Sequence, residues 1–504
     1  MFRLDPKQAV IDHVANRKAQ ATPGELGPLA AEIAARPVEP AYSAAVISGL
    51  AQASEALLLA IAGFALFFAM GGDPMVHVLT TLGIIAVTEV IATYLRIHRV
   101  AAYRSGVPQM WRAVLAWSVA IMLLYGAALL LDGSGVLIRA WIIAWWGVGT
   151  VAIVLLRLIV GQLVRRWTAE GKLRRRTVIV GGGRDAEALI AAVAKGAADD
   201  LQLIGLFDDR NDDRSPESVA SVAKLGRVAD LVEFARRTRV DLVIVSMPLS
   251  AEKRVLDMLR DLWVLPVDIR LSAHMSQLRF TSKAYSYVGD LPVFDMADRP
   301  ISDWNRVFKW LFDKIVAITA LVLLSPVMII TAIAIKLDSK GPVLFVQKRH
   351  GFNNELIGVY KFRSMYTTQA DSDAKKLVTR DDPRITRVGR FIRKTSIDEL
   401  PQLFNVLKGE LSIVGPRPHA LQAKADNQLY YEAVEGYFAR HRVKPGMTGW
   451  AQINGWRGET DTVDKIMQRV NCDLYYIENW SLWLDLKIVL LTPMSLLTKN
   501  ENAF

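Results

Sequence analysis

The sequence predicts a membrane protein of mixed architecture, with a four-helix transmembrane bundle, an α/β domain, a re-entrant membrane helix and a second, C-terminal α/β domain. Three observations predict this class. The chain has 504 residues, which is more than a single domain usually holds. Its hydrophobic fraction is 52%, and long apolar runs cluster in its first third. Its charged fraction is 22%, which is too high for a chain that lies entirely within a membrane.

Residues 1–40 predict a cytosolic tail. This segment is polar and rich in Ala and Pro, and it lacks the apolar core and small-residue cleavage site of a signal peptide. Cys472 is the only cysteine in the sequence. An intramolecular disulfide and a cysteine-based metal site are therefore excluded, which fits the reducing cytosol.

Residues 41–165 predict four membrane spans. Each apolar run reaches about the 20 residues that cross a bilayer core, and the runs are 44–70, 76–95, 111–131 and 138–160. Four buried helices of a soluble core are the alternative. Positive charge marks the cytosolic side of a membrane protein. Among the connecting segments, it occurs in the second connection and after the fourth run, at Arg96, His98, Arg99, Arg104, Arg165 and Arg166. We therefore expect the N-terminus and everything after residue 165 on the cytosolic side.

Residues 170–300 predict a Rossmann-like α/β domain. A buried strand, 177–180, runs into Gly181, Gly183 and Ala186, which match the pattern G-x-G-x-x-A between a strand and a helix. Such a loop allows a tight turn and the approach of a phosphate to the helix N-terminus. Two interpretations stay open. The domain is structural or regulatory without a dinucleotide, or an acidic residue after the second strand, at Asp208 or Asp209, binds a ribose hydroxyl.

Residues 301–340 predict a re-entrant membrane helix. The apolar stretch 315–335 is long enough to span, but both of its flanks are basic and prefer the cytosol. Pro326 removes a backbone donor and clashes with the carbonyl of Val322, and the hydroxyl of Ser325 could satisfy that freed backbone. We expect a broken helix that dips into the inner leaflet and returns. A kinked ordinary span is the alternative, and it would place the rest of the chain on the outer face.

Residues 341–504 carry the chemistry-bearing motifs. Asp398 and Glu399 are adjacent carboxylates in a segment rich in Lys and Arg, and Pro416 and Pro418 flank Arg417 with rigid backbone. Phosphoryl transfer needs an anionic nucleophile or base, a divalent metal, and cations that take up charge. The alternative for the carboxylates is a helix capping box from Ser396 to Glu399. Arginines at every third residue (384, 387, 390 and 393) predict a basic stripe for phosphates, or a solvated face.

Three sequence runs in this segment together resemble the bacterial sugar transferase family, the monotopic polyprenyl-phosphate hexose-1-phosphate transferases. They are KFRSM, DPRITRVGRFIRKTSIDELPQLFNVLKGELSIVGPRP and KPGMTGWAQINGW. The Ser-Pro break before them is similar to the re-entrant helix of that family. The four spans and the Rossmann-like domain resemble its long branch. The resemblance implies an α/β monotopic catalytic domain in the bacterial inner membrane, acting at the start of exopolysaccharide or capsule synthesis.

The same resemblance implies roles for single residues. Asp398 would attack the sugar-linked phosphorus of a UDP-sugar, expel UMP and pass the phosphosugar to undecaprenyl phosphate. Glu399 would assist, and Asp398 and Glu399 would hold Mg²⁺. The substrate contacts would be Lys361, Arg363, Arg417 and Arg349, with Pro416 and Pro418 as the frame of Arg417. UDP-glucose is the expected donor, and UDP-galactose or a UDP-N-acetylhexosamine would need only small changes in the pocket.

Other classes of function make different demands on the sequence. A nucleotide-sugar oxidoreductase or epimerase needs a Tyr-x-x-x-Lys pair, and none occurs between residues 174 and 300. A membrane scaffold or transporter predicts paired polar residues inside the spans, where Glu89 shows no evident partner in the sequence. The net charge of +11 could serve nucleic acid, lipid or a phosphate-bearing substrate. We expect membrane lipid and phosphate-bearing substrates as partners, no nucleic acid, and a homodimer as an option left open.

Overall fold

The computed structural model describes most of the chain as two compact units, Glu39–Arg174 on one side and Met1–Val38 with Arg175–Phe504 on the other. The described residues are 26–38, 41–71, 73–130, 136–194, 200–210, 218–220, 222–247, 252–272, 285–288, 291–366, 382–419, 424–425, 428–434, 436–456, 458 and 462–498. Of the predicted tail, residues 1–25, 39 and 40 lie outside them. The part that is described forms helix α2 (Pro28–Ala35), and its Ala30 and Ala34 pack into the core of the α/β domain.

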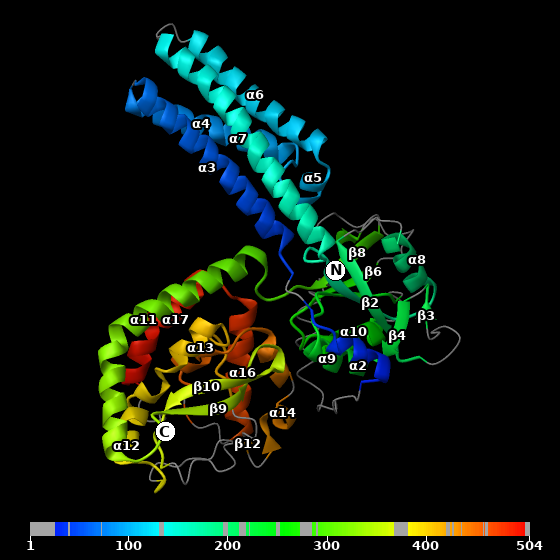
Figure 1. Ribbon diagram of the computed structural model, residues 1–504. Helices are drawn as coiled ribbons and strands as arrows, with labels where there is room; N and C mark the ends of the chain where they lie inside the picture. Colours follow the sequence, from blue (N-terminus) through cyan, green and yellow to red (C-terminus); the bar gives the residue numbers. More distant parts are fainter. Residues whose placement is uncertain are drawn as a thin grey trace, which may run out of the picture. The chain divides into compact units, whose positions relative to one another are not determined.

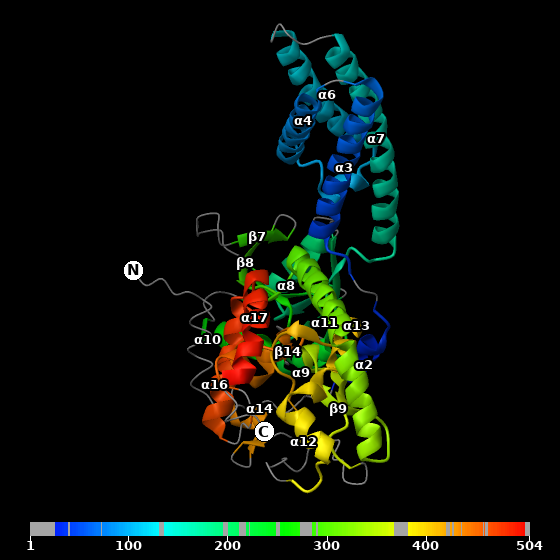
Figure 2. The same ribbon diagram turned by 90° about the vertical axis from the view of Figure 1, so that its left-hand side faces the viewer.

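The unit Glu39–Arg174 consists of helices, and each predicted apolar run is one long helix. The elements are α3 (Ala44–Met70), α4 (Pro74–Tyr94), the short α5 (Val100–Arg104), α6 (Val107–Leu130) and α7 (Val136–Ala169). Helix α3 packs on α4 and α7, and α6 packs on the same two helices (Figures 1 and 2). Asp73 caps the start of α4, because its side chain accepts from the N–H of Met75 at 2.8 Å. The four long helices and α11, described below, are long and apolar enough to cross a membrane.

A polar network joins these helices, and it corrects the expectation that Glu89 has no partner. Arg157 on α7 donates to Glu55 on α3 at 2.9 Å, with both side chains buried. Glu89 on α4 accepts from Gln52 at 2.8 Å and lies 3.4 Å from His98. The sequence hides these pairs because the partners are far apart in the chain. Glu55 and Arg157 are 102 residues apart.

The α/β domain is built on a sheet whose centre is parallel. The strand order is β3-β4-β2-β1-β5-β6-β8-β7, with β8 and β7 antiparallel at one edge and β3 antiparallel at the other. The strands are β1 (Arg175–Val180), β2 (Leu201–Phe207), β3 (Ser218–Val219), β4 (Val222–Gly226), β5 (Leu242–Val245), β6 (Asp268–Ser272), β7 (Tyr285–Val288) and β8 (Leu291–Ala297). The helices are α8 (Arg184–Ala192), α9 (Val228–Arg237) and α10 (Glu252–Leu262). The order reverses beside β1, as in a doubly wound sheet. The predicted strand at 177–180 is confirmed, and the second strand, which precedes Asp208, is β2.

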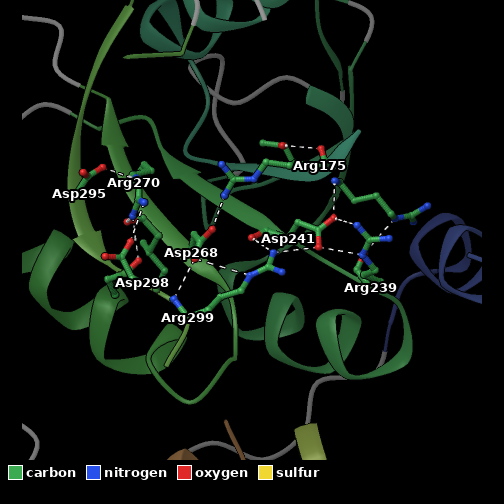
Figure 3. A network of polar contacts seen from close by, with 12 residues as sticks. Arg175, Arg239, Asp241, Asp268, Arg270, Asp295, Asp298 and Arg299 are labelled. Atoms are coloured by element: carbon green, nitrogen blue, oxygen red, sulfur yellow. Dashed lines mark hydrogen bonds and ion pairs between the residues drawn. The ribbon is translucent and has the colours of Figure 1, made fainter. Parts of the chain in front are cut away.

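An ionic network closes the N-terminal ends of the parallel strands (Figure 3). Arg239 and Arg299 both bind the carboxylate of Asp241, which lies just before β5. Burial alone would raise the pKa of Asp241, but the bond from Arg239 and the charge of Arg299 hold it below its usual value. Arg175 binds Asp268 at the start of β6. Arg299 lies in the connection between β8 and the next helix, so its bond to Asp241 fixes this connection to the start of β5.

Helix α11 (Asp303–Asp338) is continuous across the Ser325–Pro326 pair. The structure therefore shows no interruption at the expected break. The single helix changes direction along its length instead (Figure 1). Pro326 cannot donate to the carbonyl of Val322, and the hydroxyl of Ser325 donates to that oxygen at 2.9 Å instead. The predicted compensation by Ser325 is therefore confirmed, and it explains why the helix persists.

The C-terminal domain packs against α11. A hairpin of β9 (Leu344–His350) and β10 (Leu356–Phe362) is followed by α12 (Arg387–Lys394) and α13 (Gln402–Lys408). Strand β11 (Ser412–Val414) pairs in parallel with β14 (Gly446–Thr448). The remaining elements are β12 (Lys424–Ala425), β13 (Gln428–Leu429), α14 (Tyr430–Ala433), α15 (Trp450–Ile453), α16 (Val463–Glu478) and α17 (Leu482–Thr498), with 3-10 turns η3 (Phe352–Asn354), η5 (Ile397–Glu399) and η6 (Tyr437–Arg442). Lys309 of α11 binds buried Asp485 of α17 at 2.7 Å, which fixes the helix to this domain.

Candidate active site

The adjacent carboxylates lie in the short turn η5, between α12 and α13. Ser396 enters this turn in the left-handed region, with φ of 57°. Only 8% of Asp398 is exposed. The structure does not form the capping box that was the alternative for this sequence. The carboxylate of Glu399 binds side chains from distant segments instead of reaching back to the helix start.

Two cations hold Glu399. The guanidinium of Arg417 donates to both carboxylate oxygens, from Nη1 to Oε2 at 3.0 Å and from Nη2 to Oε1 at 2.5 Å. Lys361 on β10 donates from Nζ to Oε1 at 3.0 Å. Burial would raise the pKa of Glu399, but the charges of Arg417 and Lys361 hold it well below its usual value. Glu399 is therefore a fixed anion that orients two cations.

Asp398 is in the opposite state. Within the described parts of the chain it has no ion-pair partner, although its neighbour has two. Burial raises the pKa of Asp398 to about 6, and the negative charge of Glu399 adds to that effect. The charges of Lys361, Arg393 and Arg417 act against it. A buried carboxylate without a bound cation is a more available nucleophile than one held in a two-cation clamp.

The loop that carries Arg417 is held at nearly every backbone oxygen. The carbonyl of Pro416 accepts from the N–H of Gly446 at 2.9 Å, and the carbonyl of Pro418 accepts from Arg349 at 2.6 Å. The carbonyl of Arg417 itself accepts from Arg440 at 2.7 Å. A Cβ on Gly415 would lie 2.5 Å from the carbonyl of Lys444, so this close approach requires glycine. The guanidinium of Arg417 therefore projects from a rigid frame.

A buried network behind this loop was not found in the sequence. Arg440 in η6 binds Asp473 on α16 at 2.6 Å, and it also donates to Nδ1 of His419. Arg469 on α16 lies 3.3 Å from Nε2 of the same ring and is anchored on the carbonyl of Trp456. Burial and these two arginines lower the pKa of His419 well below its usual value, so the ring is neutral. No local motif marks these residues, because their contacts with His419 connect positions 21 and 50 residues apart.

The other predicted substrate contacts separate into two groups. Arg349 belongs to the site, because its charge neighbours Arg417 and Glu399 and it binds the loop at Pro418. Burial lowers the pKa of Arg349 to about 10, and the charge of Arg417 lowers it further. Arg363 lies elsewhere. Its guanidinium caps the C-terminal end of α11, with bonds of 2.8 Å to the carbonyl of Lys340 and 2.7 Å to that of Ser339.

The residues fit a divalent metal only in part. Mg²⁺ prefers carboxylate and phosphate oxygens as ligands. Both oxygens of Glu399 are bound to cations, which disfavours a second cation there. Asp398 offers a carboxylate that no described side chain binds, whereas Glu399 would have to exchange a bound cation for the metal. No group of three potential metal ligands occurs among the residues that the structure covers.

The glycine-rich loop of the α/β domain has a different environment. Gly181 has φ of 95°, and a Cβ there would lie 2.7 Å from the carbonyl of Ser246. The N–H of Gly182 donates to Asp208 at 2.7 Å. The position where a phosphate would meet this loop is thus bound by the chain's own carboxylate. Gly183, with φ of 97°, and fully buried Ala186 serve the turn into α8.

Two family profiles match the chain. The bacterial sugar transferase family matches residues 304–499, which include α11 and the carboxylate turn. A family described as a CoA-binding domain matches residues 95–273, which include most of the parallel sheet.

Named relatives extend this similarity to most of the chain. A UDP-glucose:undecaprenyl-phosphate glucose-1-phosphate transferase of Klebsiella pneumoniae is 36% identical over 75% of this chain and 79% of its own length. An undecaprenyl-phosphate glucose phosphotransferase of Komagataeibacter xylinus is 43% identical over 69% of this chain, which spans 64% of that protein. An exopolysaccharide production protein of Rhizobium leguminosarum bv. phaseoli is 48% identical over 39% of this chain and 99% of its own length. With these matches around the carboxylate turn and beyond it, the chain belongs to the bacterial sugar transferase family.

Proposed function

We propose that the protein transfers glucose-1-phosphate from UDP-glucose to undecaprenyl phosphate and releases UMP. The observation that carries the proposal is the asymmetry of the carboxylate pair. Glu399 is bound by two cations, whereas Asp398 is buried, unpaired among described side chains, and directly beside them. The names of the Klebsiella and Komagataeibacter relatives support the same donor and acceptor.

In the first step, an oxygen of Asp398 attacks the phosphorus that carries the sugar. A bond forms between that oxygen and phosphorus, and the bond from phosphorus to the bridging oxygen breaks, so UMP leaves with the bridging oxygen. Arg417 and Lys361 use only part of their donors on Glu399. Their remaining N–H groups are available to neutralise charge on the transferred phosphoryl group.

In the second step, an oxygen of undecaprenyl phosphate attacks the phosphorus of the aspartyl phosphosugar. The bond between Asp398 and phosphorus breaks, and the carboxylate is regenerated. Splitting the transfer lets a water-soluble donor and a lipid acceptor use one site in turn. It also avoids bringing two mutually repelling phosphates together at once.

Mg²⁺ is part of the proposal. Asp398, Glu399 and the phosphate oxygens of the donor would hold it. When bound, the ion would reduce the charge of the diphosphate and improve UMP as a leaving group.

The membrane arrangement is proposed on separate grounds. Helices α3, α4, α6 and α7 would form a transmembrane bundle in the bacterial inner membrane, and the basic connections would face the cytosol. Helix α11 would enter and leave on the cytosolic side, since basic residues flank it at both ends. The proposal includes contact with membrane lipid and a homodimer.

The test is UMP release by purified protein with Mg²⁺ and UDP-glucose, with and without undecaprenyl phosphate. We expect lipid-dependent UMP that Asp398→Asn lowers by about 1,000-fold or more, because the nucleophile is lost. Asp464→Asn, at an exposed position of α16, is the matched control and should keep full activity.

The same assay separates the alternatives. UMP from UDP-galactose or a UDP-N-acetylhexosamine, but not from UDP-glucose, would change the sugar and keep the reaction. Normal turnover by pure, folded Asp398→Asn would remove this residue from the nucleophile role. Absence of UMP from every UDP-sugar would reject the reaction itself.

A further inference from the structure

A cavity lies away from the carboxylate site, between the α/β domain and the C-terminal domain. Its volume is about 980 Å³, which is at the upper end for a small-molecule site. Its walls come from the end of α9, the turn before β6, the first turns of α11 and residues 442–444. None of Asp398, Glu399, Arg417 and Lys361 lines it. It lies at the N-terminal ends of the parallel strands, opposite the glycine-rich loop.

The lining of this cavity is strongly cationic. Among the described residues, ten lysines and arginines line it, against three acidic residues. Several of these cations already have partners. Arg239 and Arg299 bind Asp241 (Figure 3), and Lys309 binds Asp313 at 3.1 Å. Lys314 donates to the carbonyls at the end of α13.

Two of the lining cations differ from these. Arg306, on the first turns of α11, and Lys444, just before β14, have no hydrogen-bond or ion-pair partner for their side chains in the described part of the chain. Both side chains are exposed to solvent. Partial desolvation lowers the pKa of Lys444, and the charges of Lys314, Arg306 and Lys309 lower it further, against the opposing charge of Asp313. The donors of Arg306 and Lys444 are thus free to bind an added anion, which would also offset the repulsion among the gathered cations.

We propose that this cavity binds a phosphate-bearing ligand, with Arg306 and Lys444 as its anion-binding side chains. The inference goes beyond the sugar-phosphate transfer and does not depend on it. A phosphate group fits because it accepts several charge-assisted hydrogen bonds and carries enough charge to balance both cations. The glycine-rich loop does not offer a comparable place, because Asp208 already binds it.

The backbone connects this cavity to the active site. Lys444 is followed by Pro445, whose carbonyl accepts from the N–H of Ser412 at 2.9 Å, and by Gly446, whose N–H donates to Pro416 at 2.9 Å. Pro416 precedes Arg417, which holds Glu399. A ligand bound at Lys444 would therefore adjoin the backbone that frames Arg417.

Two kinds of ligand carry such a phosphate group, a soluble nucleotide and a lipid headgroup. Binding is measured on the full-length protein in two arms. In detergent without anionic lipid, the probe is ADP, which lacks the uridine of the donor. In nanodiscs of phosphatidylcholine, the probe is added phosphatidylglycerol. The variants are Arg306→Ala/Lys444→Ala, the charge-keeping Arg306→Lys/Lys444→Arg, and Lys336→Ala, an exposed lysine at the other end of α11 that does not line the cavity.

For at least one of the two probes, ADP or phosphatidylglycerol, we expect the double alanine variant to bind at least tenfold more weakly than the wild type. The charge-keeping variant should retain most of the affinity, which separates lost charge from lost folding. Loss for ADP identifies a soluble ligand, and loss for phosphatidylglycerol alone identifies a headgroup. Equal binding by the wild type and the double alanine variant in both arms, or equal weakening by Lys336→Ala, would overturn the proposal.

Discussion

Asp398 and Glu399 occupy consecutive positions, yet their carboxyl groups are shifted in opposite directions. Asp398 is buried and Glu399 is partly buried, and this burial raises the pKa of each. The difference lies in the partners, because Arg417 and Lys361 bind Glu399 directly and act on Asp398 only through space. One turn of chain thus supplies a permanent anion and a carboxylate near its titration point, as pairs of catalytic carboxylates often do.

The raised pKa of Asp398 predicts an acid limb in the pH profile. Below about pH 6 the carboxyl becomes protonated and cannot attack, so kcat/KM should fall about tenfold for each pH unit. At pH 5 roughly one tenth of the plateau value is expected. The measurement is initial-rate UMP release between pH 4.5 and 8 at constant ionic strength. A profile that is flat down to pH 4.5 would contradict it.

Arg393 provides a sharper form of the same test. Its charge lowers the pKa of Asp398, so Arg393→Gln should move the acid limb to higher pH. Lys394→Gln is the matched control, since this neighbouring cation is exposed and is not among the charges that act on Asp398. Both shifts are read from the same pH profile, and an equal movement in the two variants would remove Arg393 as the cause.

The two shifts also have opposite consequences for stability. The raised pKa of Asp398 means that its burial destabilises the fold above about pH 6, and this cost disappears as pH falls. The lowered pKa of Glu399 stabilises the fold above its ordinary value, and that contribution is lost as pH falls through the folded value.

Single residues were predictable from sequence where a motif carries them. The carboxylate pair and the proline-framed arginine are local patterns, and the structure brings Lys361, Arg349 and Arg417 around Glu399. Arg363 lies only two residues from Lys361, and a continued strand would place both side chains on one face, but β10 ends at Phe362. Its place at the end of α11 depends on packing that no local pattern contains. The same reason hides Arg440, Arg469 and Asp473.

Among the elements, α11 is long enough to cross a membrane and contains a proline whose missing hydrogen bond a neighbouring serine replaces. The bond from Ser325 to the carbonyl of Val322 keeps the helix continuous where proline removes a donor. The apolar length and the position of Pro326 were readable from the sequence. The continuity was not, because a proline inside an apolar helix is compatible with both a break and a kinked, continuous helix.

The re-entrant arrangement predicts that both ends of α11 lie on one side of the membrane. In a Cys472→Ser background, a cysteine placed in the Arg96–Arg104 connection and one placed in the C-terminal domain should react equally with an impermeant maleimide in inverted vesicles. Neither should react in intact spheroplasts. Opposite labelling of the two positions would mean that α11 is an ordinary span.

The pair of Arg157 and Glu55 should stabilise the packing of α7 on α3. Arg157→Ala leaves a buried carboxylate without its cation, which costs roughly 3–5 kcal/mol. Arg157→Met combined with Glu55→Gln should cost less, because no charge is left unpaired. Arg139→Ala, at an exposed position of the same helix, is the control. Thermal unfolding in detergent checks this order, and equal losses for Arg157→Ala and Arg139→Ala would contradict it.

At the scale of the whole molecule, the transferase motifs and the rest of the chain are distinct. The Rhizobium relative matches this chain over 39% of its residues yet over 99% of its own length, so a far shorter chain accommodates the corresponding part. The α/β domain contacts the C-terminal domain through Asn353, which donates to the carbonyl of Ala235, and through the cationic cavity.

We therefore expect a chain lacking residues 1–300 to keep UMP release when it is extracted as a folded protein. Its stability should fall, because contacts such as the bond from Arg442 to the carbonyl of Asp298 are lost. The measurement compares UMP release per folded molecule, with Asp398→Asn in the truncated chain as the blank. Complete inactivity of a monodisperse, folded truncation would show that the first 300 residues take part in the chemistry.

At this scale, the sequence predicted the features that a short stretch of chain determines by itself. Long apolar runs and the strand before Gly181 were identified within a few residues. The packing of α2 into the α/β core and the polar network of Glu55, Glu89 and Arg157 were not, since each joins segments distant in the chain. For the same reason, the cavity could not be foreseen.

Asp208, bound to the N–H of Gly182, has a consequence for how the α/β domain relates to nucleotide-binding proteins of the same design. A carboxylate tethered by the chain competes with a free phosphate for this N–H at a very high local concentration. The loop can therefore keep the shape of a phosphate-binding turn while its own chain satisfies the donor.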